Sequence, residues 1–382
     1  MDGRSFLVLG RKGSGKTAIY KRFQDSTDFD WLADGYSFDD YPWHHHELQE
    51  EVGVPEERRY IHSWKYLILI SVAKILLNRD SSQPCADSSL ASLSVLESLV
   101  VDTYGDRDPD MSTLFTPDRK IKISGELGLK FVSLKAEKIE MRDLPVHIQG
   151  VNRAIQQCVI DCLNPSLKYF VCFDQLDLGF DPNDAKYSQR LKGLLIAARD
   201  LFVAARSAGK FLTPAVFLRD DIYQDLQFED KNKISENFTT SIAWESEGAD
   251  LTLKQLMEAR FNSVLGNGSG DISWDDVFGE EESARMPSRQ TKYRHISDRT
   301  FLRPRDVIKF CNGILDEHRQ SPSDSGRFGN ESIHAARVGH SNYLLNEIDD
   351  EISKHVPRYK DCIEVLKSVG LEKFDYETFA RK

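Results

Sequence analysis

Short apolar runs alternate with longer amphipathic stretches over about the first 245 residues of the chain. The apolar runs predict strands at 5–10, 36–38, 169–174, 212–221 and 239–245. The helical spacing of apolar positions predicts helices after Lys16 and at 56–77, 88–102, 144–163 and 184–209. Strands that alternate with helices are typical of an α/β fold, in which a mostly parallel sheet is flanked by helices on both faces.

The same pattern divides the chain into domains, and its 382 residues are enough for two or three hydrophobic cores. We place an α/β domain at 1–247, with an insertion at about 80–142, and a smaller helical lid domain at 248–355, where strand patterns stop. Within the insertion, residues 119–140 alternate apolar and polar side chains and predict a hairpin. Residues 356–382 look like the beginning of a winged-helix segment, which would make the chain a core or a truncated product.

The segment GRKGSGKT, which ends at Thr17, matches the phosphate-binding pattern GxxxxGK[ST] and lies between a predicted strand and a predicted helix. Its glycines let successive backbone N–H groups point at a phosphate, and the helix that follows adds its positive dipole end. Lys16 is expected to reach the terminal phosphates, and the Thr17 hydroxyl to bind Mg²⁺. The predicted nucleotide-binding residues are Gly10, Arg11, Lys12, Gly13, Ser14, Gly15, Lys16, Thr17 and Ala18.

A second candidate segment, YFVCFDQLDLGF, places Asp174 at the end of a buried strand. An acid at that position binds Mg²⁺ directly or through water in nucleotide-binding enzymes, so we predict Thr17 and Asp174 as the metal ligands. Asp177 either orients the attacking water or begins the next loop. Gln175 occupies the place where many ATPases have a glutamate base, which leaves the rate of hydrolysis open but not nucleotide binding.

Thr17 and Asp174 lie far apart in the sequence, with room for a strand and several helices between them. This spacing favours the ATPases in which an extra strand lies between the two halves of the site, and it disfavours compact nucleotide kinases. The chain has neither an NKxD motif for guanine nor the LSGGQ signature of transporter ATPases, so ATP is the expected nucleotide. A small-molecule kinase remains an alternative.

Five segments occur in this order: FLVLGRKGSGKTAI, FVCFDQLDLGFD, AVFLRDDIYQDL, SIAWESEGADLTLKQLMEARF and FLRPRDVIKFCN. Together they resemble a bacterial family of P-loop ATPases allied to the STAND and KAP NTPases and, more distantly, to AAA+ proteins of the origin-recognition type. The resemblance spans residues 5–355. It implies a P-loop NTPase fold of the additional-strand (ASCE, AAA+-like) kind and a function in stress signalling or antiphage defence.

The resemblance also implies two further kinds of catalytic residue. A polar sensor at the end of the strand after the magnesium acid is matched by Arg219 or Asp220, and an arginine that touches the γ-phosphate from the lid is matched by Arg305 or Arg303. Pro304 fits the first turn of a helix, which independently places both lid arginines at a helix start. An arginine on a second domain reaches the nucleotide only when the domains close, which would make it a sensor of hydrolysis.

Charge and composition restrict the partners. A net charge of -11, with 29% charged residues, disfavours broad attraction to nucleic acid or to anionic membranes. The longest apolar stretch, at 66–77, is too short to cross a bilayer, unlike the membrane-anchored KAP proteins. Scattered cysteines without a CxxC pair indicate a reducing compartment, and we expect a cytoplasmic protein in which Cys158 and Cys162 are core thiols.

Other polar segments have structural explanations that we prefer. Adjacent histidines at 44–46 point in different directions, and the acids around Trp274 lack the spacing of a calcium loop. Residues 119–138 hold six bases and two acids, so the hairpin is a candidate for contact with nucleic acid or a protein partner.

The sequence therefore predicts a Mg²⁺-dependent ATPase, slow in turnover, that uses nucleotide as a conformational switch. Its catalytic residues would be Asp177, Arg305, Arg303 and Arg219, its cofactors ATP and Mg²⁺, and its partners a protein effector or further copies of itself. The alternative is an origin-recognition-like protein that binds DNA in an ATP-dependent manner.

Overall fold

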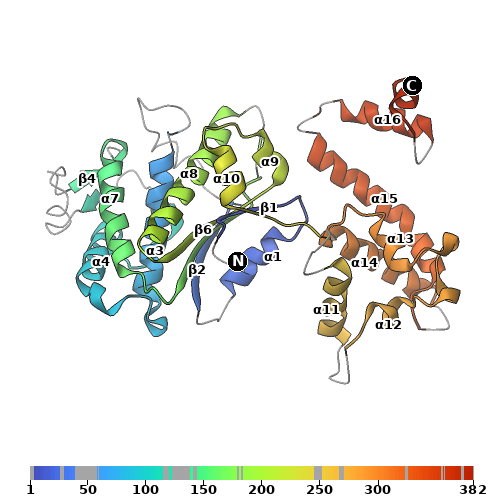
Figure 1. Ribbon diagram of the computed structural model, residues 1–382, viewed down its shortest axis with the longest axis horizontal. Helices are drawn as coiled ribbons and strands as arrows, with labels where there is room; N and C mark the ends of the chain where they lie inside the picture. Colours follow the sequence, from blue (N-terminus) through green and yellow to red (C-terminus); the bar gives the residue numbers. More distant parts are fainter. Residues whose placement is uncertain are drawn as a thin grey trace. The chain divides into compact units, whose positions relative to one another are not determined.

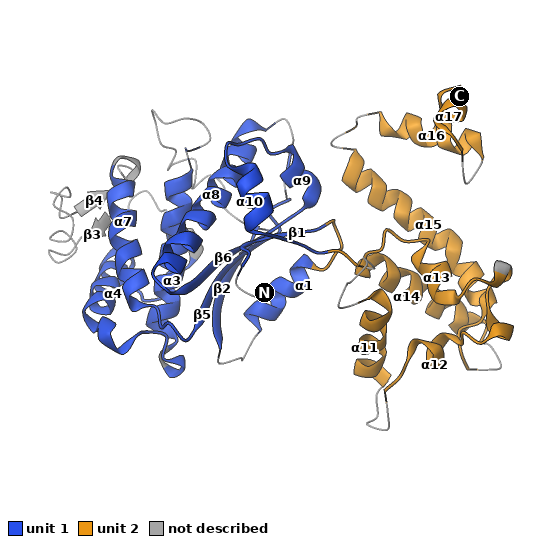
Figure 2. Cartoon of the chain, in the orientation of Figure 1, with its two compact units in different colours: residues 1–10, 16–242 blue, residues 11–15, 243–382 orange. Residues whose placement is uncertain are grey.

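The structure is a computed structural model, and it describes residues 4–25, 30–38, 58, 60–114, 120–122, 138–140, 144–178, 180–181, 184–244, 252–265, 271–322, 326–353, 356, 358–370 and 374–381. These residues form two compact units (Figure 2). Unit 1 comprises residues 1–10 and 16–242, and unit 2 comprises residues 11–15 and 243–382. The division passes through the glycine-rich segment, whose central residues belong with the C-terminal helices.

Unit 1 is built on a sheet of five parallel strands in the order β2-β5-β6-β1-β7. The strands are β1 (Leu7–Leu9), β2 (Trp31–Ser37), β5 (Lys168–Asp174), β6 (Phe211–Leu218) and β7 (Thr239–Ser241). β6 pairs with β1 on one side and with β5 on the other. The prediction of an extra strand between the glycine-rich segment and the buried acid is therefore confirmed.

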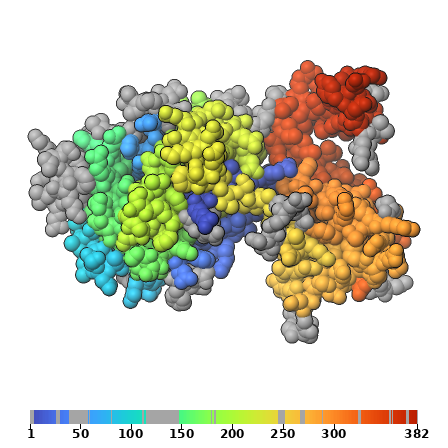
Figure 3. Space-filling model, in the orientation of Figure 1, coloured from blue at the N-terminus to red at the C-terminus, as the bar shows by residue number. Residues whose placement is uncertain are grey.

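The helices of unit 1 pack on both faces of this sheet, as Figure 1 shows. They are α1 (Lys16–Gln24), α3 (Ile61–Asn78), α4 (Leu90–Tyr104), α5 (Met111–Leu114), α7 (Leu144–Cys162), α8 (Ala185–Ser207), α9 (Asp220–Asp225) and α10 (Lys231–Asn237), with 3-10 turns η3 (Asp80–Ser82) and η4 (Asp87–Ser89). In Figure 3 the yellow side chains of α9 and α10 form one continuous part of this unit's surface.

Alternate residues of β5 enter two different cores. Tyr169, Val171 and Phe173 join a large core made with α3, α4, α7 and α8, whereas Phe170 and Cys172 join a small core covered by α1. Both sets are buried, which explains why this strand reads as a continuous apolar run in the sequence. The segment at 80–142 contributes α4 to the large core.

Strand β2 is longer than its predicted span of 36–38 and begins at Trp31. Gly35 interrupts the apolar run because α1 packs directly on it. A Cβ atom at Gly35 would lie 2.7 Å from Tyr20 Cε2 and 2.5 Å from Gln24 Nε2. Gly35 therefore interrupts the apolar pattern that would identify β2 in the sequence, and it also allows α1 to pack closely on that strand.

The predicted hairpin at 119–140 is confirmed where the structure describes it. β3 (Lys120–Lys122) pairs antiparallel with β4 (Lys138–Glu140). Three of the six basic residues that make this hairpin a candidate interface, Arg119, Lys130 and Lys135, lie outside the described residues.

The described part of unit 2 consists of helices, with residues 11–15 of the glycine-rich segment packed against them. The helices are α11 (Leu253–Leu265), α12 (Trp274–Phe278), α13 (Lys292–Ser297), α14 (Pro304–Gln320), α15 (Asn330–Ile352), α16 (Tyr359–Val369) and α17 (Tyr376–Ala380), with 3-10 turns η6 (Glu282–Ala284) and η7 (Pro287–Arg289). Trp274 and Phe278 stack in its core with ring centroids 4.0 Å apart. No helix in the described parts of the chain is long and apolar enough to cross a membrane.

Candidate functional site

The glycine-rich segment forms a tight loop between β1 and α1. Its entry is fixed by a hydrogen bond of 3.3 Å from the Gly10 N–H to the Leu218 carbonyl of β6. Gly13 and Gly15 have φ angles of 80° and 106°, a region that residues with a Cβ atom rarely adopt. The glycines are thus required by the backbone path of the loop, and α1 begins directly after them at Lys16.

The Lys16 side chain folds back over the start of the loop. Its Nζ donates a hydrogen bond of 2.7 Å to the Gly10 carbonyl. Burial lowers the pKa of Lys16, while the nearby carboxylates of Asp177, Asp174 and Asp220 raise it, so that the net shift is downward. Asp174, which the sequence predicts as a metal ligand together with Thr17, is close enough to Lys16 for their charges to interact within unit 1.

Asp174 ends β5 with a carboxylate that lacks a full set of partners. The residue is 2% exposed, and its Oδ2 atom is buried without a hydrogen-bond partner among the described residues. Burial raises the pKa of this carboxyl, while hydrogen bonds from the Thr17 side chain and the Gln175 backbone, together with the charge of Lys16, oppose the shift. An orphaned buried carboxylate oxygen beside a hydroxyl group is the arrangement that a hard cation such as Mg²⁺ would complete.

Arg219, which directly follows β6, forms ion pairs with two carboxylates. Arg219 Nη1 is 3.5 Å from Asp177 Oδ2, and Arg219 Nη2 is 2.5 Å from Asp221 Oδ2. Arg219 is the N-cap residue of α9, so the chain turns from strand to helix at the arginine. Arg219 and Asp177, both predicted from the sequence, are therefore brought together by the fold.

Gln175 adopts a left-handed backbone conformation with φ of 59°, which costs energy for a residue with a side chain. The Ser37 hydroxyl at the end of β2 donates a hydrogen bond to the Gln175 Oε1 atom. Strain held by a neighbouring strand is found often at functional sites. The side chain directly after Asp174 is thus fixed in position.

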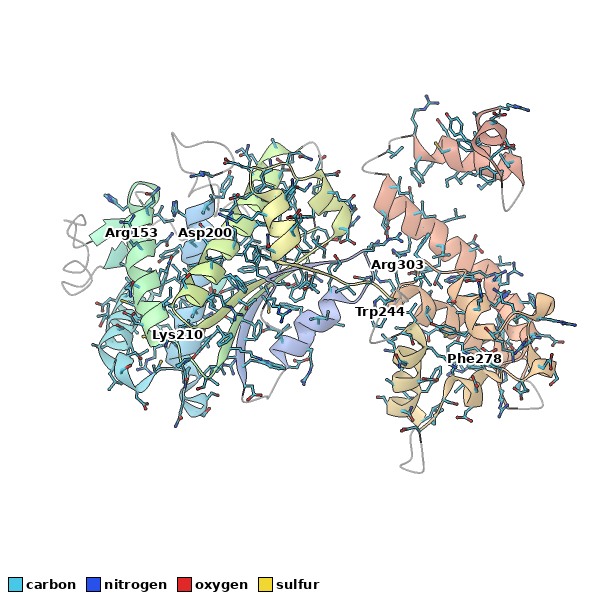
Figure 4. The ribbon with its side chains drawn as sticks, viewed as in Figure 1. Arg153, Asp200, Lys210, Trp244, Phe278 and Arg303 are labelled. Atoms are coloured by element: carbon cyan, nitrogen blue, oxygen red, sulfur yellow. The ribbon has the colours of Figure 1, made fainter. Side chains whose placement is uncertain are left out.

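Arg303 in unit 2 is held by carboxylates and by the loop. Its side chain is 2% exposed, and it forms a two-point ion pair with Asp306 at 2.8 and 3.1 Å. Its Nη1 atom also donates to the Lys12 carbonyl at 3.0 Å and pairs with Glu351. Burial alone would lower the pKa of Arg303, but Asp306 and Glu351 outweigh it and raise the pKa. Arg303 (Figure 4) therefore fixes the backbone of the loop.

Arg305, in the first turn of α14, packs against the same loop, but its side chain is half-exposed. A Cβ atom at Gly13 would be 3.1 Å from Arg305 Cβ, and the Arg305 N–H is 3.5 Å from the Gly13 carbonyl. The guanidinium of Arg305, with 49% of its side chain exposed, is 3.6 Å from Glu347. Of the two lid arginines predicted from the sequence, Arg305 is the one whose charged end is accessible.

Other loop contacts were not anticipated from the sequence. The Trp244 indole N–H (Figure 4) donates to the Ser14 carbonyl at 2.9 Å, and the Arg11 guanidinium lies over the Phe301 ring at 5.1 Å. Acids at 347, 350 and 351 of α15 pair with the basic side chains of the loop. The spacing of these acids, which places them on one helix face, was the only available signal, and it does not identify a partner.

The remaining polar candidates have structural roles or fall outside the described residues. No group of three or more His, Cys, Asp or Glu side chains in the described residues could hold a metal ion. Cys158 and Cys162 are buried free thiols, as predicted, and burial raises the pKa of Cys162 to about 12. Asp276, one of the acids near Trp274, forms a capping box with Ser273 at the start of α12. The histidines at 44–46 lie outside the described residues.

Comparison with known proteins gives one match. Residues 251–349, from just before α11 to near the end of α15, match a family described as the FunZ-associated C-terminal helical domain. The chain matches no curated protein and no solved structure. The match covers about a quarter of the chain and concerns the helices that carry Arg303 and Arg305.

Proposed function

We propose that the protein binds ATP together with Mg²⁺ and hydrolyses it slowly, using the nucleotide as a conformational switch. The observation that supports this most directly is the orphaned carboxylate oxygen of Asp174, which lies beside the Thr17 hydroxyl at the exit of a glycine-rich loop. A structural carboxylate buried to this degree would normally have both oxygens satisfied. A bound cation would supply the partner that this oxygen lacks.

Each residue of the loop then has a chemical role. Backbone N–H groups between Gly10 and Thr17 would surround the phosphates, and Lys16 would leave the Gly10 carbonyl to contact their terminal oxygens. Thr17 and Asp174 would hold Mg²⁺, which neutralises charge on the phosphates when it is bound. The charge of the ion would also favour the ionised form of the Asp174 carboxyl against the effect of burial.

Asp177 is the acid best suited to accept a proton from the attacking water. Gln175 has no ionisable group, and the Arg219 guanidinium, 3.5 Å from Asp177 Oδ2, orients that carboxylate. General-base assistance of this kind contributes about 10²–10⁴ in rate. The base in this proposal lies two residues beyond the position at which many ATPases carry a glutamate, which is consistent with slow turnover.

Arg305 is proposed as the lid residue that contacts the terminal phosphate, because its exposed guanidinium lies on the loop at Gly13. Arg303 would instead hold the loop carbonyl of Lys12. The five-stranded parallel sheet and the helical C-terminal domain are consistent with the P-loop ATPases allied to STAND and KAP NTPases. Membership of that group, and a role in stress signalling or antiphage defence, are part of the proposal.

Calorimetric titration of the full chain with ATP and Mg²⁺ tests the proposal. We expect Lys16→Ala to weaken ATP binding by at least about tenfold, since it removes a charge-assisted contact with phosphate. Lys21→Ala is the matched control, because Lys21 is an exposed lysine in the last turn of the same helix. Equal affinities for the wild type and Lys16→Ala would refute the proposed site. If ATP binds but no phosphate is released, the proposed binding site stands and the proposed hydrolysis is refuted.

A further inference from the structure

Three cations of unit 2 converge on one carboxylate oxygen of α15. Glu347 Oε2 lies 3.5 Å from Lys12 Nζ, 3.6 Å from Arg305 Nη1 and 3.9 Å from Arg303 Nη2. The Glu347 side chain is only 12% exposed. This oxygen has no hydrogen-bond partner among the described residues, although it is buried. This oxygen is thus held by charge, at 3.5–3.9 Å from the three cations, without a close hydrogen bond.

The next turn of α15 extends the same contact. Lys12 Nζ donates to Asp350 Oδ2 at 3.0 Å, and Arg11 Nη2 lies 3.7 Å from Glu351 Oε2. Residues 347, 350 and 351 share one face of the helix because of their three- and four-residue spacing. The charged ends of both basic side chains in the central loop are therefore directed at acids of α15.

Two of these cations are the ones that a phosphate would need. Lys12 belongs to the glycine-rich loop itself, and Arg305 packs on Gly13. A carboxylate at this place repels phosphate and occupies its donors. A phosphate group carries more charge and more acceptor oxygens than a carboxylate, so it can displace one that lacks hydrogen bonds.

We propose that Glu347, assisted by Asp350, is a built-in competitor of the nucleotide phosphates. In the absence of nucleotide it neutralises Lys12 and Arg305, and binding of phosphate releases it. The inference rests on the proposed nucleotide site and adds a regulatory contact to it. Coupling between two sites is reciprocal, so an interaction that draws α15 away from the loop would strengthen nucleotide binding to the same extent.

The test measures ATP affinity of the full chain by calorimetry with Mg²⁺ present. We expect Glu347→Gln to tighten binding by about tenfold, which corresponds to a loop that is free of the competitor about one tenth of the time. Asp350→Asn should tighten binding by about threefold by the same relation, since it removes the more exposed of the two Lys12 partners. Glu331→Gln is the control for net charge, because Glu331 lies on the same helix about 24 Å from Glu347 at 1.5 Å per residue.

The alternative is that Glu347 only anchors the loop in its active shape. That role predicts weaker ATP binding in Glu347→Gln. Unchanged or weaker ATP binding in a folded Glu347→Gln variant would therefore refute the proposal that Glu347 competes with phosphate. If Glu347→Gln does not fold, Asp350→Asn decides the question, because the Asp350 side chain is 67% exposed and its loss is tolerable. A wild type that binds no ATP would refute the nucleotide site itself. A wild type that binds ATP with the same affinity as Asp350→Asn and Glu347→Gln would refute the competitor alone.

Discussion

Arg303 and Arg305 lie close together at the start of α14, yet their side chains are 2% and 49% exposed. Arg303 is the N-cap residue and turns into the unit to meet Asp306, while Arg305 follows Pro304 on the outer side of the first turn. The sequence resemblance treats the two as alternatives for one role. Their surroundings separate them into a residue that fixes the loop and a residue that can reach a ligand.

Replacing Arg305 should therefore affect catalysis, and replacing Arg303 should affect stability. We expect Arg305→Ala to lower ATP turnover by about 10²-fold, as removal of one transition-state donor does. Arg303→Ala leaves the fully buried carboxylate of Asp306 without its ion pair, which should cost about 3–5 kcal/mol of unfolding free energy. Phosphate release and denaturant titration measure the two effects.

Arg319→Ala serves as the control for both variants, because Arg319 is an exposed arginine in the last turn of the same helix. The assignment would be reversed if Arg303→Ala folded normally and lost turnover, and if Arg305→Ala behaved like this control.

Asp177→Asn should lower turnover without weakening ATP binding. The amide cannot accept a proton from water, so we expect a loss of about 10²-fold in turnover, within the range of general-base effects. Asparagine still accepts a hydrogen bond from Arg219, which keeps the local structure. Asp181→Asn, a nearby exposed acid in the same loop, is the matched control. Turnover that is the same in Asp177→Asn and this control would exclude Asp177 as the base.

If Asp174 binds Mg²⁺, the effect of Mg²⁺ on ATP affinity should depend on pH. Burial raises the pKa of this carboxyl above 3.8, and only its ionised form binds a cation. Acidification through the raised pKa should therefore weaken Mg²⁺ binding. Titration of Mg²⁺ at several pH values, with ATP affinity as the readout, checks this. Asp174→Ala should show weak Mg²⁺ dependence at every pH, and an undiminished dependence in that variant would contradict the assignment.

Sequence alone predicted the site elements that follow from local chemistry. The glycine-rich loop is recognised by the spacing of its residues, and the acid at the end of β5 by the apolar run before it. The separation of the two segments in the chain predicted a strand between them, and β6 lies there. The unpredicted contacts depend on tertiary structure. Nothing local connects Glu347 with Lys12 or Trp244 with Ser14, since each pair is separated by more than two hundred residues.

The early part of β2 was missed for a related reason. Asp34 and Gly35 break the apolar pattern that identifies strands, and each is explained by a neighbour distant in sequence. Gly35 provides the space in which α1 packs on the strand. Burial raises the pKa of Asp34, and the charge of Lys74 on α3 partly offsets this shift. Residues that serve a contact between elements cannot be recognised before the elements are assembled.

Trp244 should report nucleotide binding by its fluorescence. Its indole N–H donates to the Ser14 carbonyl, so a change of loop conformation alters the environment of the ring. We expect ATP to change the emission of the wild type more than that of Trp244→Phe, because Trp244 contacts the loop directly, whereas Trp64 and Trp274 are fully buried. An equal response in both proteins would mean that Ser14 does not move.

His295 should make the C-terminal unit sensitive to acid. The residue is 4% exposed, and burial, followed by the charges of Arg299, Arg337 and His334, lowers its pKa to about 4, whereas Asp298 opposes this shift. In the unfolded chain the imidazole has its ordinary pKa near 6.5. Between pH 6.5 and about pH 4 the unfolded state therefore binds a proton at His295 that the folded state does not bind. The unfolding free energy should therefore fall as the pH is lowered from about 6.5 to about 4.

His295→Gln should remove this share of the pH dependence. Glutamine keeps a polar group near Gln290, which contacts His295 Nδ1 at 3.2 Å, but it does not titrate. Between pH 7 and pH 5 we expect the wild type to lose on the order of 2 kcal/mol more unfolding free energy than the variant, at about 1.4 kcal/mol per pKa unit. Denaturant titrations at both pH values measure the difference, with His334→Gln, an exposed neighbour, as the control. Parallel losses in the wild type and His295→Gln would show that His295 is already charged in the folded protein.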